Sequence, residues 1–248
     1  MSDTGNEHEL MSIEKPFIPK YLQNSPLDIH NRTAENPILL PSKWNFAARA
    51  KGVSVERNQL GIEYIGTGMA AAIRSDHPIP KEAGIFYYEV DVIDSGPRSL
   101  IGIGFGRRSS YLNRQPGWDH STIGYHGDDG LVFLETGIRG NAYGPLYFSG
   151  DTIGCCLNYY DQTVFYTKNG INLGIASTRI FAGKLYPMVG MRNRFACLEV
   201  NFGARPFKYN IEYHAKTIFD KANVRSRNKS VFEEVSYAMS DLGISDQF

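Results

Sequence analysis

The chain has 248 residues, which is long enough for one domain with a full hydrophobic core. Its 26 lysines and arginines balance its 26 aspartates and glutamates, so the formal net charge is zero. A balanced charge gives no electrostatic signature of nucleic-acid or anionic-membrane binding. Glycine (25), tyrosine (15) and phenylalanine (14) are abundant, which favours a domain rich in strands and tight turns.

The cysteines and the N-terminal sequence bear on the cellular compartment. Cys155, Cys156 and Cys197 follow no disulfide-framework spacing, which favours a reducing environment. The first residues lack the basic and apolar regions of a signal peptide. No apolar run reaches the roughly 20 residues that a membrane-spanning helix needs. We therefore expect a soluble protein of the cytoplasm, with the nucleus as a second location.

The chain divides into three regions by composition. Residues 1–37 are polar, aperiodic and interrupted by proline and asparagine, which predicts a disordered or loosely packed segment. Residues 38–210 carry short apolar or alternating runs separated by turn residues. These runs predict strands at Gln59–Tyr64, Ala70–Arg74, Ile85–Ile93, Leu100–Phe105, Asp151–Asn158, Thr163–Thr167, Ile171–Ile175, Tyr186–Met191 and Cys197–Asn201.

Strands this short, with no helical period between them, predict an all-β antiparallel sandwich of two sheets. The pair Asn169-Gly170 separates two of the predicted strands and is typical of a type I′ hairpin turn, because both residues tolerate positive φ. Gly102 and Gly104 lie inside a predicted strand, where a missing side chain lets another backbone or a ring approach closely.

Residues 211–248 are predicted to form a linker followed by a short amphipathic C-terminal helix. Ser230 and Glu233 have the spacing of a capping box, and Gly243 follows the last periodic position. The apolar residues at helical spacing are Val231, Phe232, Val235, Met239 and Leu242. Two interpretations remain open: the helix packs back onto the domain, or it docks on a partner.

Sequence patterns for metal or cofactor chemistry are weak. His126, Asp128 and Asp129 lie close in sequence, but Gly-Asp-Asp-Gly is also a common strand-linking turn. Neighbouring cysteines in a strand point in opposite directions and do not converge on one ion. The stretch Ile101–Gly106 lacks the spacing of a dinucleotide-binding loop. We expect no metal and no cofactor.

One enzymatic alternative rests on three carboxylates of one predicted strand. Glu89, Asp91 and Asp94 resemble the acidic strand of laminarinase-like glycoside hydrolases, which are also β-sandwiches. Retaining glycosidases hold two carboxyl groups about 5–5.5 Å apart, and a bulge would be needed to bring Asp94 onto the face of Glu89. The third position is Asp rather than Glu, and the chain has two tryptophans for stacking sugar rings. We therefore expect a protein that is not an enzyme.

A series of short motifs between residues 39 and 207 resembles a SPRY domain of the RanBPM type, which occurs in scaffold subunits of the CTLH (in yeast, GID) ubiquitin ligase. The matching segments are His77–Pro80, Gly84–Val90, Ile101–Gly104, Asn113–Asp119, Gly124–Gly130, Tyr143–Pro145, Gly150–Cys156, Phe165–Gly170, Leu173–Ala176, Leu185–Pro187 and Asn201–Gly203. The resemblance implies a bent, concanavalin-like sandwich that binds short linear peptides through loops at one end. It also implies partner recruitment to a ubiquitin ligase.

Family scaffolds usually continue into helical assembly modules, whereas this chain ends after one predicted helix. A free-standing adaptor that competes with full-length scaffolds is therefore the alternative. By position in the fold, the peptide-binding segments are expected at Gly66–Ala71, Ser109–Asp119 and Met191–Phe195. The residues expected to contact a peptide combine rings with hydrogen-bonding groups. They are Tyr111, Asn113, Arg114, Trp118, Arg192, Asn193, Arg194 and Phe195.

Overall fold

The computed structural model describes residues 16–135 and 139–224, which fold into two antiparallel sheets packed face to face. The first sheet holds, in spatial order, β1 (Trp44–Arg49), β4 (Ala71–Ser75), β13 (Leu185–Met191), β6 (Ile101–Arg107), β7 (Ile123–His126), β8 (Leu131–Leu134) and β9 (Asn141–Ala142). The second holds β12 (Ile171–Ser177), β11 (Thr163–Lys168), β10 (Thr152–Asn158), β5 (Ile85–Asp94), β14 (Cys197–Asn201), β3 (Gly61–Tyr64) and β2 (Val53–Val55). The predicted all-β sandwich is confirmed.

The hydrophobic core lies between the sheets and depends on the alternation in β5. Tyr88 of β5 packs edge-on against Phe105 of β6, with ring centroids 5.7 Å apart. Its hydroxyl donates to the Gly104 carbonyl oxygen at 2.6 Å. A Cβ at Gly104 would clash with the carbonyl oxygen of Ile123 in the neighbouring strand. This glycine therefore permits the close approach that the sequence predicted.

The outer face of β5 is also covered, and the N-terminal segment supplies part of the cover. The Tyr21 hydroxyl accepts from the Tyr87 backbone N–H at 2.9 Å and donates to the carbonyl of the same residue at 3.3 Å. Phe207 packs edge-on against Tyr87, with ring centroids 5.0 Å apart, and also against Tyr21, at 6.0 Å. Both faces of this strand are thus buried in a sheet that is antiparallel.

The prediction of a loosely packed N-terminal segment is wrong for residues 20–33. A 3₁₀ turn (Lys20–Leu22) and helix α1 (Pro26–Thr33) form there, and Leu22 and Leu27 are fully buried. Ser25 caps α1 by accepting from the Asp28 N–H at 3.4 Å. Two turns of helix are too short to give a readable apolar period, so the sequence looked aperiodic.

Residues 211–224 are helical, whereas the sequence analysis assigned them to a linker. Asn210 accepts from the Tyr213 N–H at 3.1 Å and caps the first turn. Ile211, Ala215 and Ile218 are buried at helical spacing, which was the signal in the sequence. The predicted helix beginning at Ser230 lies outside the described residues.

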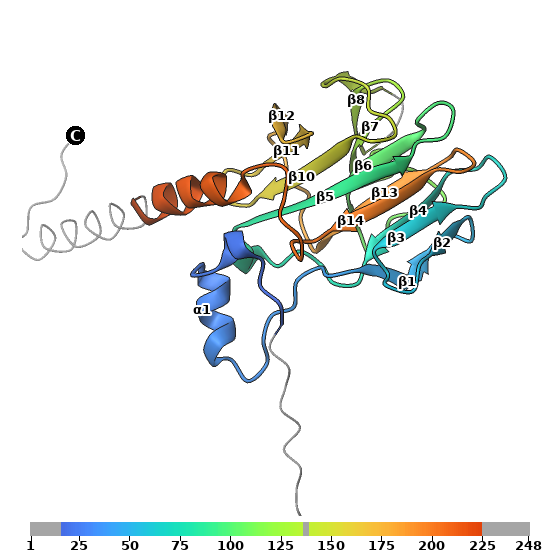
Figure 1. Ribbon diagram of the computed structural model, residues 1–248. Helices are drawn as coiled ribbons and strands as arrows, with labels where there is room; N and C mark the ends of the chain where they lie inside the picture. The colour runs from blue at the N-terminus through green and yellow to red at the C-terminus, as the bar shows by residue number, and fades with distance from the viewer. Residues whose placement is uncertain (1–15, 136–138, 225–248) are drawn as a thin grey trace, which may run out of the picture.

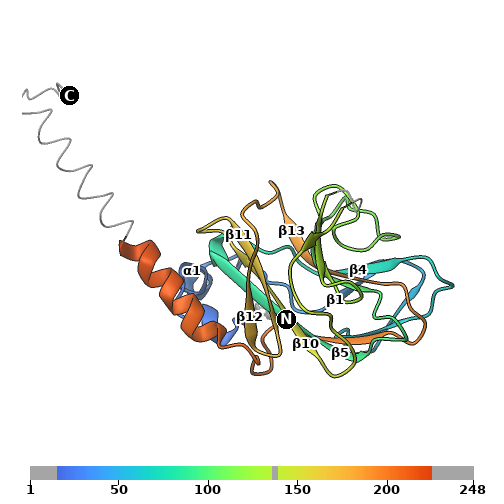
Figure 2. The same ribbon diagram turned by 90° about the horizontal axis from the view of Figure 1, so that it is seen from above.

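Figures 1 and 2 show how the ends of the sandwich differ. The helix of residues 211–224 and α1 lie together at one end. The connections β3–β4 and β13–β14 project at the opposite end, which we call the loop end. None of the described helices is both long and apolar enough to cross a membrane.

The predicted strands are present, with ends shifted by a few residues, whereas β1, β2, β7, β8 and β9 were not predicted. Asn169 and Gly170 have φ of 50° and 82°, as a type I′ turn requires. Cys155 and Cys156 are both buried as free thiols. Burial raises the pKa of each well above its ordinary value, so neither is a reactive thiolate.

Candidate binding surface

The structure joins the three predicted binding segments into one surface, which begins at the loop end and continues over the outer face of the first sheet. The Nε of Arg192, which follows β13, donates to the Gly68 carbonyl in the β3–β4 connection at 3.0 Å. The backbone N–H of Arg192 donates to Leu100 at 3.0 Å. The β6–β7 connection is attached to β4 through a 2.8 Å bond from the Ala72 N–H to the Leu112 carbonyl. Loops distant in sequence therefore form one surface.

Tyr111 and Arg114 are exposed side chains on a firmly held backbone. The Tyr111 ring is 61% exposed, yet its N–H donates to the Asp119 carboxylate at 2.7 Å. The Arg114 guanidinium lies over this ring, 5.7 Å from its centroid, and donates to the Trp118 carbonyl at 3.2 Å. A ring and a cation are thus presented side by side. Asn113 is exposed on the same loop.

Asn193 and Trp118 do not present their side chains in the same way. Asn193 is 5% exposed; in the orientation that satisfies its amide, Oδ1 accepts from the N–H groups of Arg98 and Ser99, each at 3.1 Å. Trp118 is half-buried and packs edge-on against Phe133, with ring centroids 6.3 Å apart. The structure therefore places both residues mainly in supporting positions beneath the loops.

Arg194 and Phe195 form the outer turn of the β13–β14 connection and are both exposed. Phe195 is 67% exposed and has φ of 69°, in the left-handed region that non-glycine residues rarely adopt. Such a conformation costs of order 1 kcal/mol or more and persists where surrounding contacts impose it. Here the Tyr64 N–H, bonded to the Ala196 carbonyl at 2.8 Å, fixes the end of the turn.

Two residues of this surface were not among the individually predicted ones, although Met69 lies inside the predicted segment Gly66–Ala71. Met69 is 72% exposed at the tip of the β3–β4 connection. The Tyr64 hydroxyl holds this loop, since it donates to the Met69 carbonyl at 2.6 Å and accepts from the Gly68 N–H at 2.8 Å.

The second residue is Asp128, in the turn between β7 and β8. Burial and neighbouring Asp129 raise the pKa of Asp128, against the opposing effect of Arg192. No sequence signal marked Asp128 as a neighbour of Arg192.

The carboxylates of the hydrolase alternative have structural partners. Glu89 is 3% exposed and accepts from the Tyr87 hydroxyl at 2.8 Å and from the N–H groups of Lys208 and Tyr209 at 3.0 Å each. The strand does bulge before Asp94, but that carboxylate accepts from the Gly96 N–H at 2.7 Å and is exposed. Glu89 therefore lies under the segment that leads into the C-terminal helix.

Asp91, the carboxylate between them, is held by Arg205, at 3.2 Å. Among the described residues, no group of three or more His, Cys, Asp or Glu side chains is arranged to hold a metal ion. His126 is buried under the β6–β7 connection, where its Nε2 lies 2.8 Å from the Pro116 carbonyl oxygen. Burial lowers the pKa of His126 to about 4.

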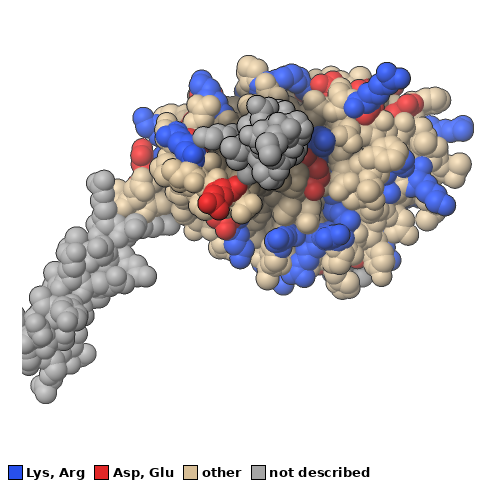
Figure 3. Space-filling model, turned by 90° about the horizontal axis from the view of Figure 1, so that it is seen from below, with Lys and Arg blue, Asp and Glu red and all other residues tan. Residues whose placement is uncertain are grey.

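Charge is spread over the molecular surface. In the face that Figure 3 shows, lysine and arginine side chains alternate with acidic and uncharged ones and form no continuous basic surface. This distribution is consistent with the zero formal net charge.

The comparisons define the class of protein. Residues 85–205 match the SPRY domain family. The crystal structure of a human SPRY domain superposes with a TM-score of 0.55 at 28% identity, covering 63% of this chain and 98% of that one. The sandwich is therefore a SPRY domain, and SPRY domains are protein-interaction modules.

Within that family the chain carries a SPRY domain of the RanBPM-like type. It is 44% identical to Ran-binding protein 9 of Xenopus laevis over 176 residues, which cover 69% of this chain and 32% of that protein. It is 40% identical to human Ran-binding protein 9 over 197 residues, which cover 78% of this chain and 27% of that protein. The chain thus spans about a third or less of the length of these relatives.

Proposed function

We propose that the loop end binds a short linear segment of a partner protein. The observation that carries this proposal is the position of Tyr111 and Arg192. Both side chains are exposed. The backbone of Tyr111 is held by the Asp119 carboxylate of the same loop. Arg192 is held by the carbonyls of Leu100 and Gly68 in other loops. Side chains that are ordered before binding lose little conformational entropy when a ligand arrives.

The exposed groups favour a peptide with an apolar anchor beside an acidic or carbonyl-rich stretch. Tyr111 and Met69 offer apolar area, and tyrosine and arginine are enriched among residues that dominate binding energy. The guanidiniums of Arg114 and Arg192 are suited to carboxylates and backbone carbonyls, which accept their planar N–H groups in pairs.

By family, the partner would be a substrate or subunit of a CTLH/GID-type ubiquitin ligase, and the chain would recruit it. A free-standing adaptor that competes with longer scaffolds for the same peptides is the alternative. Affinity purification of the full chain from cells distinguishes them. Co-purification of ligase subunits that carry RING domains supports recruitment, and peptide partners without those subunits support the adaptor.

Peptide capture itself is tested with a peptide array probed by the full chain, followed by titration of the best peptide. The double variant Tyr111→Ala, Arg192→Ala is expected to weaken binding about 1,000-fold, since two such residues in an interface each contribute about 2 kcal/mol. The melting temperature is expected to stay within about 2 °C of the parent, because exposed substitutions change stability little.

The matched control is Tyr213→Ala, Arg57→Ala, which removes the same two residue types from exposed positions outside the loop end. This control is expected to bind as the parent does. Equal losses in both double variants, or a large drop in the melting temperature of the loop variant, would contradict the proposal.

A further inference from the structure

Two grooves adjoin at the end of the sandwich opposite the loop end. The first has a volume of about 510 Å³ and lies between the α1–β1 connection, the β4–β5 connection and the start of β13. The second, of about 600 Å³, lies between the start of α1, the β10–β11 turn and residues 180–182. Lys81 and Glu82 line both, so we treat the two as one continuous surface, the basal groove.

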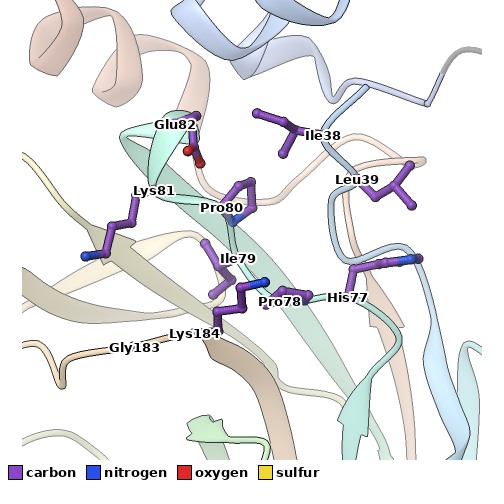
Figure 4. Close-up of a pocket in the computed structure, with 10 residues that line it drawn as sticks. All are labelled: Ile38, Leu39, His77, Pro78, Ile79, Pro80, Lys81, Glu82, Gly183 and Lys184. Carbon is purple, nitrogen blue, oxygen red and sulfur yellow. The ribbon is translucent and has the colours of Figure 1, made fainter. Parts of the chain in front are cut away.

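The basal groove combines an apolar lining with a rim that carries two lysines, Lys81 and Lys184, and one carboxylate, Glu82. Figure 4 shows Ile38 and Leu39 on one side of the first groove and Ile79 across from them. Lys81 and Lys184 are exposed at the rim, and the ammonium end of Lys184 extends toward the prolines of the β4–β5 connection. A ligand for this surface needs an apolar face with acidic residues beside it.

The chain itself passes next to the basal groove. Phe219 of the helix of residues 211–224 packs edge-on against Tyr160, with ring centroids 6.1 Å apart. Tyr160 also lines the second groove. Five residues (225–229) follow this helix before the predicted capping box, and five extended residues span up to about 17 Å. The helix continues five residues beyond Phe219, about 7.5 Å at the usual rise, so the extended linker is long enough for the sequence from Ser230 onward to turn back to the groove.

That sequence matches the chemistry of the groove. Its apolar positions recur at helical spacing, and acidic residues lie between and beside them. The apolar set is Val231, Phe232, Val235, Met239 and Leu242, and the acidic set is Glu233, Glu234 and Asp241. We propose that residues 230–242 dock as an amphipathic helix in the basal groove of the same chain. This site is separate from the loop end and does not depend on peptide capture there.

The first test is zero-length carbodiimide crosslinking of the unmodified full chain, read by mass spectrometry of the separated monomer and dimer bands. The proposal predicts isopeptide bonds between Lys81 or Lys184 and acidic residues of segment 230–242. Lys51 is the internal control, because it is an exposed lysine in the β1–β2 turn, beside the β3–β4 connection. Links that form between two copies and not within one copy would overturn the proposal in favour of a second copy. If neither Lys81 nor Lys184 forms a link to segment 230–242, the proposal is also overturned.

The second test uses variants of the full chain. Phe232→Ser with Met239→Ser is expected to reduce the crosslink yield at the rim lysines about tenfold, since the two substitutions remove apolar area from the docking face without adding carboxylates. Ser240→Asn, on the polar side of the predicted helix, is expected to leave the yield unchanged. Thermal melts identify any variant that has lost its fold. Equal yields in the two variants would contradict docking through the apolar face.

Discussion

The two ends of the sandwich use the same kinds of side chain in opposite ways. At the loop end, Tyr111 and Arg192 have their backbones fixed and their side chains exposed. At the other end, Tyr21 and Glu89 turn inward, and their polar atoms hold the segments that precede α1 and the C-terminal helix. Residue type alone therefore does not separate an exposed side chain from a supporting one; what separates these pairs is burial, since Tyr21 and Glu89 are 5% and 3% exposed while Tyr111 and Arg192 face solvent.

The largest effect on stability is expected at Glu89, which tests directly whether the buried polar side chains support the fold. Glu89→Ala leaves two backbone N–H groups without their acceptor and removes one of the two partners of the Tyr87 hydroxyl, so the free energy of unfolding should fall by about 4 kcal/mol. Denaturant unfolding measures this change. The control is Asp94→Ala, an exposed carboxylate with one backbone bond, which should cost about 1 kcal/mol or less. Similar losses would show that Glu89 is no internal clamp.

The next effect is a pH dependence that originates beneath the loop end. Burial lowers the pKa of His126 to about 4 in the folded state, whereas the unfolded value is about 6.5. Between these values the unfolded chain binds the proton and the folded chain does not. Stability should therefore fall by up to about 3 kcal/mol as the pH drops from 6.5 to 4.

Unfolding free energies of the parent and of His126→Gln, measured across this range, isolate that contribution. The variant should lose less stability on acidification, because it has no imidazole to protonate. His30→Gln, at an exposed position of α1, should behave as the parent does. Parallel curves for the parent and His126→Gln would contradict a buried neutral imidazole.

Trp118 is an intermediate case, because its side chain is half-buried and could either support the fold or contact a ligand. Trp118→Ala should lower the free energy of unfolding by about 2 kcal/mol, since the indole packs on Phe133 and His126. Tyr111→Ala, on the same loop, should change it by less than about 0.5 kcal/mol. Chemical denaturation of both variants decides the matter. If Trp118→Ala is as stable as Tyr111→Ala, the indole belongs with the binding residues.

The smallest effect is expected at Tyr21, whose hydroxyl ties the N-terminal segment to β5. Tyr21→Phe removes the hydroxyl that pairs with the backbone of Tyr87, and a lost buried bond of this kind costs about 1 kcal/mol. Tyr213→Phe, at an exposed position of the helix of residues 211–224, is the matched control and should leave stability unchanged. Equal melting temperatures for all three proteins would mean that Tyr21 adds nothing to the fold.

The sequence predicted the sandwich because its strongest signals are local. The alternation in β5 and the Asn169-Gly170 turn each specify their own geometry without help from distant residues. The short strand β2 and the two-residue strand β9 escaped detection because three or fewer residues carry no period. Helix α1 was missed for a related reason: its buried face depends on tertiary contacts that no local pattern encodes.

The sequence predicted where the candidate segments lie in the fold more accurately than it predicted which of their side chains are exposed. The loop around Tyr111 and the turn at Arg192 meet as expected, because strand order fixes where connections emerge. Asn193 turned inward, because two backbone N–H groups nearby needed an acceptor. Met69 was overlooked since a lone methionine in a glycine-rich turn gives no signal; its exposure depends on the tether from Tyr64.

That tether has a kinetic consequence. Because one phenolic oxygen closes the β3–β4 connection on itself, this loop needs no slow rearrangement before an encounter becomes productive. We therefore expect similar association rates for different ligands of the proposed surface, and their affinities should differ mainly through their dissociation rates.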